Sequence, residues 1–157
     1  MLLYFLRHAD AEDAGASDFE RELTSKGREQ SEKMGRFCAG LKSRPELILV
    51  SPVLRAEQTA TCVAAQLDGV ESIVCPWLAC GMEPATCASE LAAYKQFTSV
   101  LLVGHEPDIG LAIAYFMGIS ALNLRIRKAS LTALESGTLQ PGSAQLQFML
   151  PVQLAPK

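Results

Sequence analysis

Apolar residues along the chain gather into short continuous runs separated by longer mixed segments. The clearest runs lie at residues 2–6, 47–50 and 99–103, and a weaker one lies at 72–75. Short apolar runs bounded by polar or turn-forming residues are typical of strands buried on both faces of a sheet. The pattern therefore predicts a strand at each of these positions.

The mixed segments between the runs repeat their apolar residues at helical spacing. The repeat is strongest after the last run, where Ile109, Ile113 and Phe116 are three or four residues apart. Thr24 or Ser25 is suited to cap the first of these segments, because a hydroxyl oxygen accepts a hydrogen bond from the free amides of a helix start. The predicted helices cover residues 25–42, 53–67, 84–95 and 106–117.

Alternation of strands and helices implies an α/β fold with a mostly parallel sheet and helices on both faces. The C-terminal part differs, because residues 130–136 and 144–150 alternate apolar and polar side chains. The sequence GTLQPGS between them favours a turn, so these segments predict a hairpin. The 157 residues suffice for a sizeable core, and we expect a single domain over residues 1–157.

Composition and charge narrow the possible functions. Apolar residues make up 49% of the chain and charged residues 20%, which is typical of a folded globular protein. The net charge is −3 with both signs interspersed, so no basic stripe suggests nucleic acid. No apolar run approaches the roughly 20 residues of a membrane helix, and Arg7-His8 interrupts the first run too early for a signal peptide. We expect a cytoplasmic protein that binds neither nucleic acid nor membrane.

The cysteines point to packing rather than to a metal site or a disulfide framework. Their number is odd, no C-x-x-C pair occurs, and the chain has only two histidines. In a reducing compartment we expect free thiols, most of them in the core. The cysteines are Cys38, Cys62, Cys75, Cys80 and Cys87.

Cationic side chains follow three of the predicted strands. Arg7 and His8 end the first, Arg55 lies in SPVLRAEQT after the second, and His105 lies in GHEPD after the strand at 99–103. Parallel sheets bind ligands beyond the carboxyl ends of their strands, so adjacent strands would bring these side chains together. Taken singly, Arg55 could be a surface helix residue and His105 a helix cap.

Two arginines and two histidines at one edge would repel one another without an anion between them. Phosphate fits, because a guanidinium presents a planar fork of donors and helix amino ends add favourable dipoles. The chain has no G-x-x-x-x-G-K-S/T nucleotide loop and no cluster of metal-binding carboxylates. A neutral imidazole can itself attack phosphorus. We therefore expect phosphoryl transfer through a histidine, without metal or cofactor.

Four segments resemble the signatures of the histidine phosphatase superfamily. They are RHA at the end of the first strand, RELTSKGREQ at 21–30, SPVLRAEQTA at 51–60 and VGHEPDIG at 103–110. Their order and spacing resemble the short bacterial branch, the SixA-type phosphohistidine phosphatases, over residues 2 to about 150. The resemblance implies a phosphoglycerate mutase-like fold.

The resemblance also implies roles for individual residues. His8 matches the nucleophile that becomes phosphorylated, and Arg7 and Arg55 match the arginines that hold the phosphoryl oxygens. His105 matches the second histidine, which bonds the phosphate and stabilises its developing charge. Arg21 matches an arginine near the pocket whose role is less defined; glutamate follows it where many relatives have proline.

The substrate depends on whether a general acid is present. Glu83, Glu106 and Asp108 are the candidates, although each also suits the start of a helix. Phosphohistidine has a better leaving group than a phosphate ester and needs less acid catalysis. The short inter-strand segments also leave little chain for a lid.

We therefore expect a phosphohistidine protein as substrate, such as a histidine phosphotransfer domain in signal transduction. A small-molecule phosphomonoesterase of broad specificity and a non-enzymatic phosphoprotein-binding module remain as alternatives. We expect a monomer.

Overall fold

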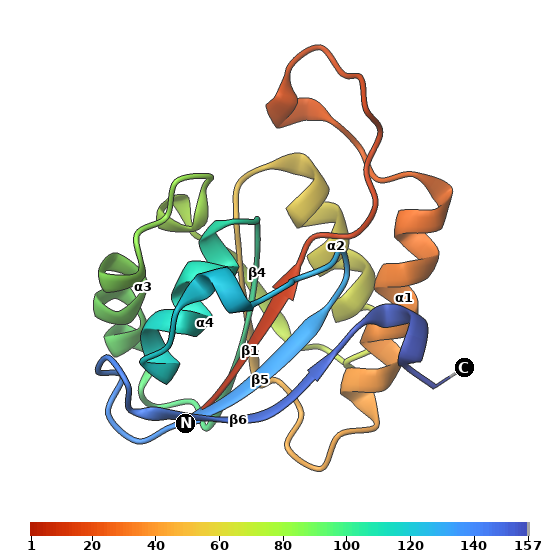
Figure 1. Ribbon diagram of the computed structural model, residues 1–157. Coiled ribbons are helices and arrows are strands. Elements are labelled where there is room, and N and C mark those ends of the chain that lie inside the picture. The colour runs from red at the N-terminus through yellow and green to blue at the C-terminus, as the bar shows by residue number, and fades with distance from the viewer. Residues whose placement is uncertain (157) are drawn as a thin grey trace.

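A six-stranded mixed sheet forms the centre of the molecule (Figure 1), in a computed structural model that describes residues 1–156. The strand order is β3-β2-β4-β1-β5-β6. The first four strands along the chain are mutually parallel, and the last two are antiparallel to their neighbours. Their bounds are β1 Leu2–Arg7, β2 Leu47–Val50, β3 Glu71–Val74, β4 Ser99–Gly104, β5 Leu131–Ser136 and β6 Ala144–Leu150. The predicted α/β fold with a mostly parallel sheet is confirmed.

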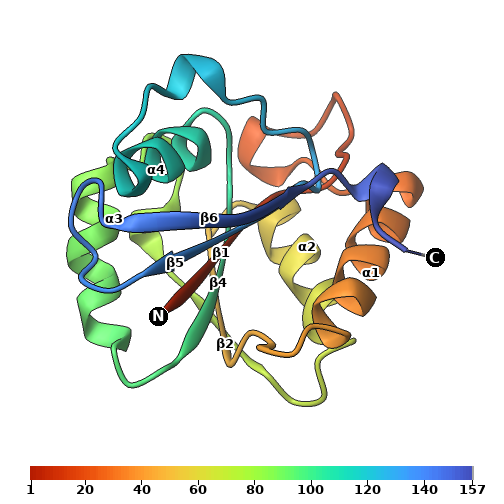
Figure 2. The ribbon, with the colours of Figure 1, turned by 60° about the horizontal axis from the view of Figure 1, so that its bottom comes forward.

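Helices cover both faces of this sheet, as predicted (Figure 2). Tyr4 and Leu6 of β1 pack into the core beneath α1 and α2, while Leu3 and Phe5 pack into the core beneath α3 and α4. This alternation follows from the period of two along a strand and makes β1 apolar on both faces. The helices are α1 Ser25–Ala39, α2 Leu54–Ala64, α3 Pro84–Leu91 and α4 Asp108–Met117. Short 3-10 helices are η1 Asp18–Glu20, η2 Pro76–Leu78, η3 Ala92–Tyr94, η4 Ala121–Asn123 and η5 Val152–Leu154.

The helices are shorter than the apolar periodicity predicts. Thr24 caps α1 as expected, since its hydroxyl oxygen accepts a hydrogen bond from the Gly27 amide at 2.9 Å. At the other end α1 stops before Gly40, and α2 stops at Ala64. Leu67 is nevertheless buried, so it continues the apolar pattern from the turn that follows α2. The spacing of apolar residues indicates which side chains are buried. A turn that packs on the core therefore continues the apolar pattern beyond the last residue of the helix.

The predicted hairpin is also present, as β5 and β6. In addition β5 pairs with β1, which places Leu131 opposite Leu6. The main chain just before β5 also bonds the end of β1, through Arg7 N–H to the Ser130 oxygen at 3.3 Å and Ala129 N–H to the Arg7 oxygen at 3.1 Å. The segment leading into β5 therefore lies directly beside Arg7, which the sequence did not indicate.

Two further expectations concern the cysteines and the membrane. Cys38, Cys75 and Cys87 are buried, as expected for packing residues, and Cys80 is exposed. Within residues 1–156, no helix combines the length and the apolar character needed to cross a membrane.

Candidate active site

The carboxyl ends of β1, β4 and β2 meet at one edge of the sheet. The residues directly after these ends are His8, His105 and Ser51, and the ring centroids of the two histidines lie 5.3 Å apart. Arg55 reaches the same place from the first turn of α2, with its Nε 3.2 Å from Nε2 of His8. Arg7 is the last residue of β1. The structure thus gathers the cationic residues singled out in the sequence at one edge.

His8 is held as a neutral imidazole in one tautomer. Its Nδ1 lies 2.8 Å from the carbonyl oxygen of Ala9, which can only accept, so Nδ1 carries the proton. Nε2 therefore keeps a lone pair, which accepts the hydrogen bond from Arg55. Burial lowers the pKa of His8 to about 3, and the charges of Arg55, His105 and Arg7 act in the same direction against the bond to Ala9. At neutral pH Nε2 is an unprotonated nitrogen beside a guanidinium.

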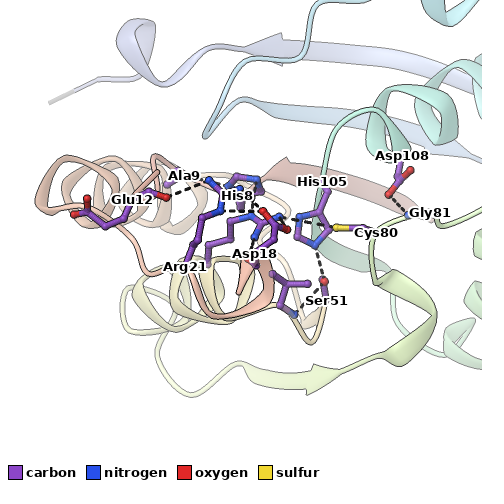
Figure 3. Close-up of polar contacts among 12 residues, drawn as sticks. His8, Ala9, Glu12, Asp18, Arg21, Ser51, Cys80, Gly81, His105 and Asp108 are labelled. Atoms are coloured by element: carbon purple, nitrogen blue, oxygen red, sulfur yellow. Dashed lines mark hydrogen bonds and ion pairs between the residues drawn. The ribbon is translucent and has the colours of Figure 1, made fainter. Parts of the chain in front are cut away.

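Arg55 is buried, with 4% of its surface exposed, and each of its guanidinium nitrogens has a partner. Nε donates to His8, Nη1 donates to the Asp18 carbonyl oxygen at 2.7 Å, and Nη2 lies 3.2 Å from Oδ2 of Asp18. Figure 3 shows Asp18 beside His8, and Arg55 contacts both of these residues. The guanidinium plane is fixed by these contacts, so Arg55 is not an ordinary surface residue of its helix.

His105 is also buried, and its two ring nitrogens differ. Nε2 lies 2.6 Å from the hydroxyl oxygen of Ser51, whereas Nδ1 is buried and has no partner among residues 1–156. When Ser51 donates to Nε2, Nδ1 carries the proton and is an unused donor. Burial lowers the pKa of His105 to about 4, with Arg55 acting in the same direction and Asp18 opposing. The side chain therefore bonds Ser51 and does not cap the following helix.

Arg7 contributes a second unused donor to this edge. Its Nη1 donates to the carbonyl oxygen of Ile126 at 2.8 Å, and its Nε is buried without a partner in the described part of the chain. Burial lowers the pKa of the guanidinium, and Glu106 opposes that shift. Nε of Arg7 and Nδ1 of His105 are thus two buried nitrogens at this edge without a partner among residues 1–156.

Arg21 is linked to His8 through Asp18 and Arg55. Its Nε and Nη2 lie 2.9 and 2.8 Å from Oδ1 of Asp18, and its Nη1 donates to the Glu12 carbonyl oxygen at 3.1 Å. Asp18 thus bridges two arginines. The positive charge of Arg55 is the main cause that lowers the pKa of the Asp18 carboxyl group. Arg21 holds Asp18 (Figure 3), and Asp18 in turn holds Arg55.

Reasoning from the sequence missed Asp18, Ser51 and Cys80 at this site. Ser51 follows a predicted strand directly, so the rule that found His8 could have found it. Asp18 begins the short 3-10 helix η1 before α1, and Sγ of Cys80 lies 4.0 Å from Nη2 of Arg55. Neither occupies a strand end or a periodic segment, so no pattern in the sequence marks them.

Comparison with known proteins identifies the family. The sequence model of the histidine phosphatase superfamily (branch 1) matches residues 3–79. Phosphohistidine phosphatase SixA of Escherichia coli is 36% identical over 121 residues, which cover 73% of each chain. This chain belongs to the histidine phosphatase superfamily. An uncharacterized protein of Picosynechococcus sp. is 34% identical over 146 residues, 87% of this chain and 86% of the relative.

The solved structures agree with this assignment. The protein histidine phosphatase SixA complexed with tungstate superposes with a TM-score of 0.88 and 27% identity, over 98% of both chains. The fold is therefore the phosphoglycerate mutase-like fold of SixA, and the chain is a phosphatase. Membership of this superfamily favours an enzyme over the non-enzymatic binding module.

The three candidate acids of this histidine phosphatase have different surroundings. Glu83 is exposed at the start of α3, and the Asp108 carboxylate accepts a hydrogen bond from the Gly81 amide at 2.8 Å. Glu106 is half-buried and accepts from the Gly110 amide at 2.8 Å; burial raises its pKa, against the influence of Arg7. A raised pKa favours the protonated form of a carboxyl group, so Glu106 remains a candidate acid.

We expect acid to destabilise the fold as soon as the unfolded histidines begin to protonate. Both histidines have folded pKa values below their ordinary 6.5, so the unfolded chain binds more protons as the pH falls. The free energy of unfolding should therefore decrease from pH 6.5 toward pH 4. Thermal unfolding at pH 7 and pH 5 measures this effect. The chain has only two histidines, so the fall in Tm should be smaller in a His8→Gln/His105→Gln variant, and an equal fall would contradict the interpretation.

Proposed function

We propose that this phosphatase removes the phosphoryl group from phosphohistidine on a protein, through a covalent phospho-His8 intermediate and without a metal ion. The observation that carries the proposal is the state of His8. It is a neutral imidazole whose unprotonated Nε2 accepts a hydrogen bond from the guanidinium of Arg55. That arrangement suits attack on phosphorus between cationic groups.

In the first step Nε2 of His8 attacks phosphorus in line with the leaving group. The N–P bond to His8 forms, and the bond from phosphorus to the substrate imidazole breaks, with its electron pair leaving on that imidazole. Nε of Arg55 gives up its bond to His8 and donates to a phosphoryl oxygen instead. The negative charge of the transferred group is spread over its equatorial oxygens. The two unused donors, Nε of Arg7 and Nδ1 of His105, form hydrogen bonds to the other equatorial oxygens.

In the second step water attacks phospho-His8. An O–P bond forms, the N–P bond breaks, and His8 recovers the lone pair on Nε2 while both protons of the water leave with the phosphate. The carbonyl of Ala9 keeps the same tautomer throughout. Positive charge at the phosphoryl group is supplied by side chains of this chain, so the reaction needs no metal.

The leaving group supports phosphohistidine as substrate. An imidazole leaves more readily than an alkoxide and so needs less help from an acid. The relative SixA is named a phosphohistidine phosphatase. The proposed partner is a histidine phosphotransfer domain in cytoplasmic signal transduction, acted on by a monomer. A small-molecule phosphomonoesterase is the second candidate, and the raised pKa of Glu106 favours it, because ester hydrolysis benefits from a proton donor.

The deciding experiment compares kcat/KM for a phosphorylated histidine phosphotransfer domain with that for sugar and alkyl phosphates. We expect the phosphoprotein to be the better substrate, and ester rates to climb as the leaving alcohol becomes more acidic. Glu106→Gln should then have little effect on the phosphoprotein, with Glu71→Gln, an exposed residue at the start of β3, as the matched control. An alkyl phosphate that turns over faster, and loses that rate in Glu106→Gln, would establish the second candidate instead.

Activity should survive a chelator. The cationic side chains already surround the proposed phosphoryl position, and within residues 1–156 no group of three or more His, Cys, Asp or Glu side chains is arranged to hold a metal ion. Hydrolysis of p-nitrophenyl phosphate should proceed at the same rate before and after dialysis against EDTA. Loss of activity that is reversed by a divalent ion would show the metal-independent mechanism to be wrong.

A further inference from the structure

The segment between η4 and β5 brings basic residues next to Arg7. Figure 1 shows this segment, in light blue, reaching the carboxyl end of β1. Ile126 is buried and accepts the hydrogen bond from Nη1 of Arg7 at 2.8 Å, whereas its neighbours Arg125 and Arg127 are exposed. The burial of Ile126 thus anchors two outward arginines beside the site of His8.

These side chains line a cavity of about 350 Å³. Its charged lining consists of five cations and one carboxylate, and the carboxylate, Asp10, pairs with Lys128 at 2.8 Å. The other four cations form no ion pair among residues 1–156. We call this cavity and its rim the basic surface; its cations are Arg7, Lys26, Arg125, Arg127 and Lys128.

The charge of the basic surface is a local exception. The whole chain carries a formal net charge of −3, so unpaired cations at one cavity are not a consequence of the average composition. Like charges that share a cavity raise a positive potential, which attracts anionic groups and speeds their encounter. Arg7 belongs both to this cavity and to the edge that holds His8. A ligand whose phosphoryl group lies at His8 therefore places its neighbouring atoms within reach of the basic surface.

We propose that the basic surface binds acidic side chains that flank the phosphohistidine on the partner protein. This inference rests on the proposed function and adds what the partner must display. Exposed guanidinium groups such as those of Arg125 and Arg127 match the planar geometry of carboxylates. Charges at the rim of an interface act mainly on the rate of association. Small phosphate esters without a second anionic group gain nothing from this surface, so it favours an acidic phosphoprotein over them.

The test uses two phosphohistidine peptides of equal length, one flanked by Asp and Glu and the other by Asn and Gln. The measurement is the ratio of their kcat/KM values, acidic over neutral. For the unmodified protein we expect a ratio of about ten at low salt, falling as salt screens the charges. In Arg125→Glu/Arg127→Glu the ratio should fall to one or below. Both peptides present the same phosphoryl group. If the substitutions displace Arg7, both kcat/KM values change by the same factor, and their ratio does not change.

Lys42→Glu/Arg44→Glu is the matched control. It makes the same change in net charge with exposed side chains near the amino ends of the strands, at the opposite edge of the sheet. This variant should keep the ratio of the unmodified protein. A ratio of one for the unmodified protein, or an equal loss in the control, would overturn the basic surface and leave the proposed function standing. Hydrolysis of p-nitrophenyl phosphate without turnover of either peptide would overturn both proposals.

Discussion

Replacement of His8 by alanine should abolish both turnover and the covalent labelling of the protein by a phosphorylated substrate. The reason is that Nε2 of His8 is the unprotonated nitrogen beside Arg55 that attacks phosphorus, and alanine removes it. Loss of the nucleophile in a covalent mechanism costs on the order of 10⁶ in kcat. Rapid quenching without acid, which preserves a phosphoramidate, followed by detection of the label on the protein, measures the intermediate directly.

Two further variants make this prediction specific to His8. His8→Gln keeps a polar group beside the buried guanidinium and should be folded yet equally inactive. His105→Ala retains the nucleophile, so it should still become labelled, although slowly. A label that persists in His8→Ala would place the covalent phosphate on another residue.

Replacement of Arg55 by alanine should lower kcat/KM by about 10²–10³, as expected for loss of one preorganised donor. Arg55→Lys should lie between this variant and the unmodified protein. A single ammonium cannot reproduce three nitrogens that contact His8 and both the backbone and the carboxylate of Asp18. The affinity of vanadate or tungstate, which imitate a phosphoryl group, should fall in parallel with the rate.

The matched control for Arg55 is Arg36→Ala. Arg36 is an exposed helix residue whose ion pair with Glu32 spans 4.0 Å, and such surface pairs contribute little. The kcat/KM of Arg36→Ala should equal that of the unmodified protein. A normal rate in Arg55→Ala would show that Arg55 does not contact the transferred group.

Much of the fold follows from local patterns along the chain. The apolar runs that became β1, β2 and β4 predict strands because they are too short for helices, and a strand buried on both faces places every side chain in the core. Helix ends were less well predicted, since Leu67 packs on the core from a turn and imitates another helical turn. The convergence of His8, Arg55 and His105 was predictable too, because parallel strands carry their following residues to one edge.

The sequence by itself therefore determined the elements, their burial and the edge at which the cationic side chains gather. Only the tertiary structure decided which groups those side chains contact. Asp18 reaches Arg55, and Ile126 reaches Arg7, across long stretches of chain and from loops without periodicity. Periodicity encodes which face of an element is buried, because burial repeats with the geometry of the backbone. The position of a loop depends instead on the packing of the whole chain, and no local pattern records it.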